Sequence, residues 1–294
     1  HRVDDNLARP MDQSFAIGTQ IKSLGAYDFT ISGTAHWLLN RYTVRYAPEG
    51  EPSYSETTVA DPGGDGLGET KVEGGGQLLT AYDRNPGGEG EELYMLTNAS
   101  RADLFLGFAL EFKMHRDSWW FVDFAGAAYM SMGSAPFGMF PDRNDPGIVH
   151  ESSADPNARL SKRGRYDPCR AFAAHLYMGF VPLEDLELVS IIRYRDGQPM
   201  TRYLIADLAQ GPTPLMAVAR GEPMPRHTFH MTWDVRVAYE LMIADSELKV
   251  SLDIYNLLGS STEILEYNLT GDQFRRSLEM VPNRAISLAL ELTW

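Results

Sequence analysis

The chain ends on the segment Ile286-Ser-Leu-Ala-Leu-Glu-Leu-Thr-Trp294, in which apolar and polar residues alternate one by one. Successive side chains of an extended strand point to opposite faces. One face of this strand would therefore carry only apolar side chains, namely Ile286, Leu288, Leu290, Leu292 and Trp294. A strand of this kind that closes on an aromatic residue is typical of a transmembrane β-barrel.

The same alternation recurs along the chain. Within 228–241, Trp233 and Val235 fall on one face, and Asp234 falls on the other. The alternation slips near Leu38, which predicts a β-bulge there. Most of the alternating runs reach the roughly 9–11 residues that cross a membrane at a tilt. We expect nine strands, at 13–24, 27–46, 94–114, 118–133, 170–181, 186–204, 228–241, 248–269 and 284–294.

These observations predict an all-β fold, an antiparallel transmembrane β-barrel segment of about nine long meander strands that form a partial barrel. No charged residue interrupts the centre of the apolar faces. A Lys or Arg on the lipid face at mid-membrane would cost roughly 2–4 kcal/mol. A soluble sandwich would also keep charges off its inner face, so this observation alone leaves both folds open.

The composition excludes several other classes of protein. The 294 residues carry a net charge of −14, which argues against nucleic acid as a partner. No window approaches 18 consecutive apolar residues, so a helical membrane protein is excluded. The single cysteine, Cys169, rules out an internal disulfide.

The predicted connections alternate between short and long. Short ones lie near 24–25, 115–117, 182–185 and 244–247, and long ones span 47–93, 134–169, 205–227 and 270–283. Outer-membrane barrels combine short periplasmic turns with long external loops. With a periplasmic C-terminus, every short turn falls on the periplasmic side. The aromatic residues expected to form a membrane girdle at that edge are Tyr27, Trp120, Phe180, Tyr239 and Trp294.

The connection 47–93 is rich in Gly and Pro and holds eleven acidic and two basic residues. Such a composition predicts a solvated, mobile loop. The acidic segments 61–69 and 142–145 have oxygen-rich side chains but not the spacing of an EF-hand, so a solvated loop is the preferred interpretation over calcium binding.

The polar faces of the predicted strands supply the candidate ligand path. The side chains expected to face the lumen are His36, His175, Tyr177, Arg193, Arg195, His230 and Arg236. They would line a transport path, or else pack against a plug or line water. His227 and His230 point to opposite faces of a strand, so we expect no shared metal. No nucleophile and base can be nominated, so we expect no catalytic residue, no enzyme activity and no cofactor.

Several motifs follow one another in a fixed order. They are Arg193-Tyr-Arg-Asp-Gly-Gln-Pro199, Trp233-Asp-Val-Arg236, Leu252-Asp-Ile-Tyr-Asn-Leu-Leu258, Thr270-Gly271 and Asn283-Arg284 before the terminal strand. Together they resemble the C-terminal barrel of TonB-dependent outer-membrane receptors of the carboxypeptidase-regulatory-like, large-loop type. The resemblance covers most of 94–294.

The resemblance implies a barrel of about 22 strands with a plugged lumen. We therefore expect residues 1–294 to be the C-terminal part of an outer-membrane β-barrel domain, with the plug domain absent from this chain. It further implies energy-coupled uptake of a scarce nutrient, such as a metal chelate, glycan or peptide, in the bacterial outer membrane. The implied partners are outer-membrane lipid, a TonB-type partner reached through the missing N-terminal part, and the barrel-assembly machinery, through strand 286–294.

Two other classes of protein remain open at the level of sequence. One is a passive porin or structural outer-membrane barrel without plug or energy coupling. The other is a soluble β-sandwich adhesin or carbohydrate-binding module, in which the apolar faces would form the core between two sheets.

Overall fold

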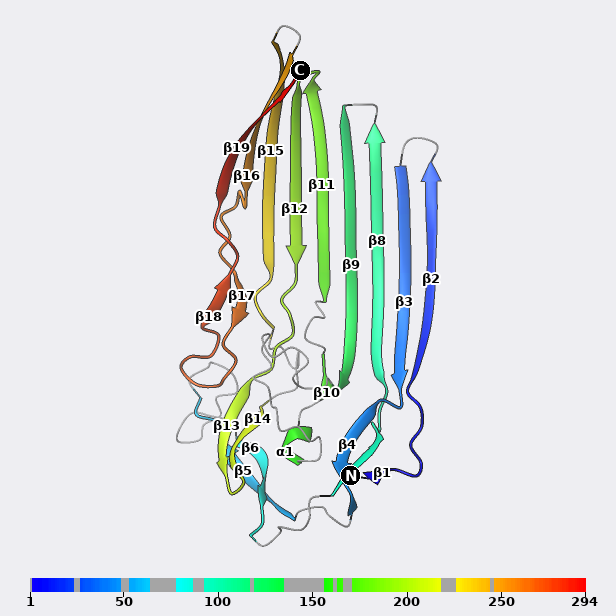
Figure 1. The fold of residues 1–294 in the computed structure, drawn as a ribbon, viewed down its shortest axis with the longest axis vertical. Helices are drawn as coiled ribbons and strands as arrows, with labels where there is room; N and C mark the ends of the chain where they lie inside the picture. Colours follow the sequence, from blue (N-terminus) through cyan, green and yellow to red (C-terminus); the bar gives the residue numbers. More distant parts are fainter. Residues whose placement is uncertain are drawn as a thin grey trace.

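Nine long strands form one antiparallel sheet in the computed structural model (Figure 1). The structure describes residues 2–23, 27–48, 53–63, 78–86, 93–116, 119–134, 156–160, 163–165, 171–217, 226–243 and 246–294. The long strands are β2 (Met11–Ser23), β3 (Tyr27–Leu39), β8 (Asp103–Arg116), β9 (Trp120–Ser134), β11 (Phe172–Leu183), β12 (Leu186–Arg195), β15 (His230–Ile243), β16 (Ser246–Tyr255) and β19 (Ala285–Thr293). They lie side by side in chain order, from β2 at one edge to β19 at the other, so the predicted nine-stranded meander is confirmed.

The pairing register keeps the apolar rows of neighbouring strands on the same side of the sheet. Ile31 of β3 pairs with Leu110 of β8, and Phe112 of β8 pairs with Phe124 of β9. A slip of one residue would turn a whole strand over, so the matching patterns fix the register. We call this side the apolar face and the opposite side the polar face.

The apolar face is open along the whole sheet. Ile17 at one edge is 66% exposed, Phe108 in the middle 46% and Leu288 at the other edge 67%. A large uncovered apolar surface marks a surface that faces lipid or a partner. The hydroxyl of Ser190 on this face is not left unpaired, because Trp233 Nε1 donates to it over 2.8 Å.

The strand ends that the short connections join lie at one end of the sheet, together with the C-terminus, and the strand ends that lead into the long connections lie at the other end (Figure 1). The predicted alternation is therefore confirmed. At two of the short turns, the residues on either side of the turn pair directly: Leu183 pairs with Leu186, and Ile243 pairs with Ser246.

Four predicted strands are too long. The segment 27–46 is divided into β3 and β4 (Tyr42–Tyr46) at Asn40, whose φ of 54° breaks the extended chain, so the predicted bulge is wrong. The segment 248–269 ends at Asn256 (φ 52°) for the same reason, because asparagine tolerates left-handed backbone. Likewise 94–114 is divided into β7 (Tyr94–Asn98) and β8, and 186–204 into β12 and the start of β13.

The shorter elements sit at the end that carries the long connections (Figure 1). β1 (Arg2–Val3), β7 and β4 form a three-stranded sheet, and β10 (Arg163–Gly164) extends the pairing of β9. Three hairpins are formed by β5 (Tyr54–Ala60) with β6 (Leu78–Arg84), β13 (Tyr203–Leu208) with β14 (Gly211–Met216), and β17 (Glu263–Glu266) with β18 (Ser277–Met280). The single described helix is α1 (Pro156–Arg159).

The buried apolar core of the described residues lies among these hairpins. Leu79 packs with Leu204 and Ala217, and Ala81 packs with Ala206 and Leu215. The prediction that 47–93 is a solvated, mobile loop is therefore wrong for β5 and β6, because alternating residues within the acidic segment pack against the β13–β14 hairpin. Segments 64–69 and 142–145 lie outside the described residues. Among the described residues, no helix is long and apolar enough to cross a membrane.

Candidate functional site

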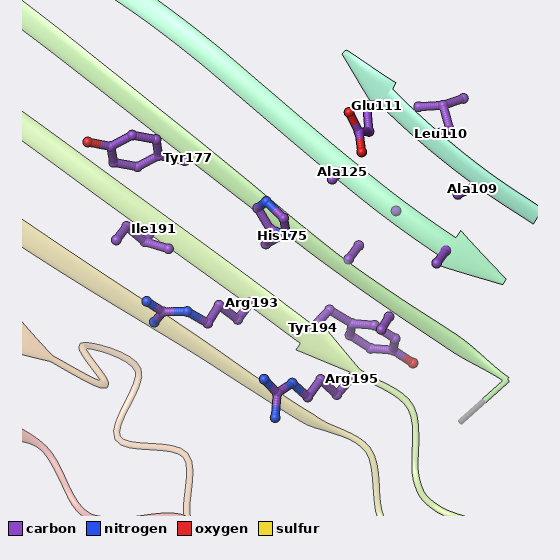
Figure 2. Close-up of a pocket in the computed structure, with 14 residues that line it drawn as sticks. Ala109, Leu110, Glu111, Ala125, His175, Tyr177, Ile191, Arg193, Tyr194 and Arg195 are labelled. Atoms are coloured by element: carbon purple, nitrogen blue, oxygen red, sulfur yellow. The ribbon is translucent and has the colours of Figure 1, made fainter. Parts of the chain in front are cut away.

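A hollow of about 690 Å³ lies on the polar face across β8, β9, β11 and β12 (Figure 2). Glu111 stands on one side, His175 lies near the centre, and Arg193 and Arg195 extend together from β12 on the other side. A volume of this size falls in the range of small-molecule sites, roughly 300–1,000 Å³. The other polar-face side chains of its lining are Ala109, Ala125, Ala127, Ala173, Tyr177 and Ile191.

Small side chains create this hollow. Ala125 pairs with both Glu111 and His175, and Ala127 pairs with both Ala109 and Ala173. Four alanines on three adjacent strands leave the sheet surface low between longer side chains. The floor of the hollow is therefore methyl groups and backbone, and its walls are charged.

The charged side chains around the hollow differ in whether they are paired with another charge. Arg193 donates a hydrogen bond to Asp234 on β15, so its charge is paired. Within the described part of the chain, Arg195 and Glu111 form no ion pair. The hollow therefore offers one guanidinium and one carboxylate to whatever occupies it, on opposite walls.

A second hollow of about 330 Å³ lies beside the first and shares Tyr177, Ile191 and Arg193 with it. Arg236 lines it and holds Asp253 through two hydrogen bonds, Nε to Oδ1 over 2.6 Å and Nη2 to Oδ2 over 3.0 Å. Such a bidentate pair fixes both side chains, so this hollow is the more rigid and better neutralised of the two.

The predicted lumen-facing residues all lie on the polar face, but they do not form one group. His175, Tyr177, Arg193 and Arg195 line the first hollow, and Arg236 lines the second. His230 is the register partner of Arg195. His36 lies apart on β3, with its Nδ1 3.7 Å from Asp12, near the edge of the sheet. Whether any of them contacts a ligand stays a prediction.

The sequence interpretation missed Glu111 as a wall of the first hollow, because that role depends on which strands become neighbours. It also missed the pairing of Arg193 with Asp234. Their side chains lie on adjacent strands, two residues apart in the register, and only the register of β12 with β15 brings them together.

The predicted girdle residues lie at the end of the sheet with the short connections. Trp120 and Phe180 pair directly across β9 and β11, and the ring of Trp119 meets Phe180 edge-on at 5.7 Å. Tyr27 begins β3, Tyr239 lies toward the same end of β15, and Trp294 follows β19.

A second aromatic row, which the sequence interpretation missed, lies at the opposite end of the apolar face. Phe172, Tyr194 and Phe229 follow one another across β11, β12 and the start of β15, with 5.6 Å between successive ring centroids. The apolar face is thus bounded by aromatic rings at both ends, as expected for an element whose two ends lie at two interfaces.

Buried charges hold the loop elements together. Asp61 and Arg202 form an ion pair of 3.2 Å with side chains only 1% and 2% exposed. His227 Nδ1 lies 2.8 Å from Glu266, and Arg275 Nε donates to the same carboxylate over 2.9 Å. Burial by itself would raise the pKa of Glu266, but the hydrogen bonds from His227 and Arg275 outweigh it and lower the pKa.

His227 and His230 are directed to different surroundings, since His227 contacts Glu266 in the loops while His230 lies on the polar face of β15. Among the described residues, no three His, Cys, Asp or Glu side chains are grouped to hold a metal ion.

Comparison with known structures identifies the class of fold. The chain aligns with the siderophore receptor PiuA from Acinetobacter baumannii over 95% of its length, with a TM-score of 0.51 and 12% identity. It also aligns with the outer membrane transporter YddB from Escherichia coli over 98% of its length, with a TM-score of 0.48 and 12% identity. No protein-family profile and no curated protein sequence matches the chain.

The alignment with PiuA shows the fold, and the predicted antiparallel barrel segment is confirmed at that level. This chain spans 28% of the length of PiuA and 33% of that of YddB. At 12% identity the alignment with PiuA shows a shared fold and does not identify a substrate.

Proposed function

We propose that this chain forms part of the barrel wall of an outer-membrane receptor that takes up a scarce nutrient by energy-coupled transport. The observation that carries the proposal is the contrast between the two faces of one sheet. Exposed apolar side chains lie on the apolar face of seven of the nine strands, those on β9 and β12 being half-buried between their neighbours, and the polar face holds two charged hollows. A membrane channel wall needs lipid on one side and a polar path on the other.

The dimensions of the apolar face support a membrane location. Phe172 and Phe180 are eight residues apart on β11, which corresponds to about 26 Å along an extended strand. At a strand tilt of roughly 40° this becomes about 20 Å along the membrane normal, close to the apolar band of about 25 Å in outer-membrane barrels. The pairing of Ser190 with Trp233 supports the same location, because an unpaired hydroxyl is costly in lipid.

The charges on the polar face support a path for a polar solute. Arg195 and Glu111, which form no ion pair within the described part of the chain, lie on opposite walls of a hollow whose floor is formed by alanines. A metal chelate, a glycan or a peptide carries hydrogen-bonding groups that such walls can contact. The chain supplies part of a barrel, so the plug and the TonB-type partner would act through the remainder of the receptor.

The terminal strand supports a further part of the proposal. β19 lies at the sheet edge, where its outer backbone groups are available to another strand. Its apolar row and the terminal Trp294 are the features that we propose the barrel-assembly machinery contacts. A soluble sandwich receives less support, because a second sheet would cover side chains such as Leu288 that are exposed.

The proposal is tested by uptake measurements on cells that express the full-length gene product. Deletion of the gene is expected to abolish accumulation of one nutrient at low external concentration. Loss of the energy-transducing partner is expected to have the same effect. Uptake that continues without that partner and rises linearly with concentration would identify a passive porin and contradict the proposal.

A further inference from the structure

The pairing register arranges the side chains of the first hollow in two rows on the polar face. The first row, from β8 across β9 and β11 to β12, is Glu111, Ala125, His175 and Arg193. The second row, two residues nearer the long connections on every strand, is Ala109, Ala127, Ala173 and Arg195. A line from Glu111 to Arg195 therefore crosses alanines and passes beside His175 (Figure 2).

The distance between the two charged walls follows from the same register. Glu111 and Arg195 lie three strand spacings apart across the sheet and two residues apart along it. With about 4.8 Å between strands and about 3.4 Å per residue, their Cα atoms are roughly 16 Å apart. An extended chain of two to four residues spans at most about 7–14 Å. The two ends of a short peptide can therefore reach both side chains at once.

Both walls offer a charge to an occupant. Glu111 and Arg195 are exposed, and neither forms a hydrogen bond or an ion pair within the part of the chain that the structure describes. Arg193, by contrast, donates to Asp234, so its charge is already paired. The first hollow thus presents one anionic and one cationic group on opposite walls, and the two charges sum to zero.

This pair of opposite charges selects among classes of nutrient. An anionic solute that reached both walls would be attracted to Arg195 and repelled by Glu111, and a cationic solute would meet the reverse. A neutral sugar would leave the ionic attraction at both walls unused. A solute with an ammonium group at one end and a carboxylate at the other forms a charge-assisted hydrogen bond with each wall.

We propose that the first hollow binds a small zwitterion, with its ammonium group at Glu111 and its carboxylate at Arg195. The distance between the walls favours a short peptide over a free amino acid. The alanine floor carries no polar side chain, so recognition depends on the two ends of the peptide and not on its sequence. The inference rests on the proposed function and names the class of nutrient that the receptor takes up.

Calorimetric titration of the purified full-length protein in detergent micelles tests this binding. Trialanine is compared with N-acetyl-trialanine, which lacks the ammonium group, and with trialanine amide, which lacks the carboxylate. Each blocked form is expected to bind about tenfold more weakly, because it loses one charged hydrogen bond. Free alanine carries the same two groups closer together. Weaker binding of alanine than of trialanine identifies the peptide as the zwitterion, and tighter binding identifies the free amino acid.

Two variants assign each end of the peptide to its wall. In Arg195→Gln, trialanine and its amide are expected to bind equally, while the acetylated form still binds more weakly than trialanine. In Glu111→Gln the acetylated form is expected to bind as well as trialanine, while the amide still binds more weakly. Lys249→Gln is the matched control, because Lys249 lines neither hollow on the polar face and donates to Glu240 over 2.8 Å. It is expected to retain both differences.

The floor of the hollow is tested by a change of size alone. Ala127→Leu places a longer side chain between Ala109 and Ala173, midway between the charged walls. All three forms of trialanine are expected to bind about tenfold more weakly, because the new side chain occupies the place of the peptide. Unchanged affinities would show that the peptide lies elsewhere and would overturn the proposal.

Equal affinity of the unaltered protein for trialanine and both blocked forms would also overturn the proposal, as would the absence of binding at millimolar concentration. The same holds if Arg195→Gln and Glu111→Gln leave both differences in place. Because purified protein is used, a failure of energy-coupled uptake in cells would not change these affinities. Absence of peptide binding would leave energy-coupled uptake of another nutrient unaffected.

Discussion

A lysine introduced at either of two adjacent positions of β12 is expected to show, by its effect on stability, which face contacts lipid and which faces the lumen. Ile192 lies on the apolar face, in register with Leu176 and Trp233, while its neighbour Ile191 lines the first hollow. The two variants Ile192→Lys and Ile191→Lys remove the same side chain and add the same charge. Only the surroundings of the new ammonium group differ.

The cost of Ile192→Lys follows from its depth. Ser190 lies midway along the apolar positions of β12, and Ile192 is two residues from it, or about 7 Å along the strand. At a tilt of roughly 40° this is about 5 Å from the membrane centre, where Lys costs roughly 2–4 kcal/mol. We therefore expect a loss of about 2 kcal/mol in the free energy of unfolding, or about 30-fold in the equilibrium constant.

The cost of Ile191→Lys is expected to be below about 1 kcal/mol, because the new ammonium group would face the polar side opposite Asp234. Urea unfolding of the full-length protein in lipid vesicles, followed by tryptophan fluorescence, measures both values. Equal losses for the two variants, or a larger loss for Ile191→Lys, would refute the assignment of the faces.

Three further predictions follow from single contacts. Ser190→Ala and Trp233→Phe are each expected to destabilise the protein in lipid, with a coupling of about 1 kcal/mol in a double-mutant cycle of vesicle unfolding. Gly197→Ala is expected to loosen the segment that follows β12, seen as faster proteolysis, because its new Cβ would lie 1.6 Å from the carbonyl oxygen of His227. The lowered pKa of Glu266 means that its carboxylate stabilises the folded loop elements above pH 4.5 and that this stability is lost as pH falls through the lower folded value. Hydrogen exchange of β17 measured against pH tests this expectation, and Glu266→Gln should remove the dependence.

Each of these has a control or a contradicting result. A coupling of zero between Ser190 and Trp233 would mean that water reaches the pair. Gly33→Ala is the control for Gly197→Ala, since its nearest neighbouring atom outside the adjacent residues would be 3.8 Å away and the same exchange of residues should be tolerated. Persistence of the pH dependence in Glu266→Gln would assign it to another group.

The long strands could be predicted from the sequence because their signal is local. Each one repeats with a period of two, and the apolar side is fixed by the residues themselves, as in Leu288 and Leu290. The ends of four strands could not be predicted, because a period of two does not show where the backbone leaves the extended conformation, as it does at Asn40 and Asn256. Only the backbone conformation at those residues shows where the long sheet stops.

The packing among the loop elements could not be predicted because its contacts join distant segments. Asp61 and Thr270 are 209 residues apart, and nothing in either segment indicates the other as its partner. An acidic, glycine-rich composition indicates a solvated loop when the partners are unknown. Only one wall of the first hollow could be predicted, for the same reason. Its cationic side chains lie close together on β11 and β12. Glu111 lies on β8 and is brought to the hollow only by the pairing of β8 with β9 and of β9 with β11.

Quenching of Trp233 fluorescence by brominated lipid tests the central claim, that the apolar face contacts the bilayer, most directly. In a full-length variant whose other tryptophans are replaced by phenylalanine, bromine at mid-chain positions is expected to quench Trp233 strongly. A tryptophan introduced by Thr232→Trp together with Trp233→Phe, on the polar face, should be protected from these lipids. Equal quenching at the two positions, or none at Trp233, would contradict the account.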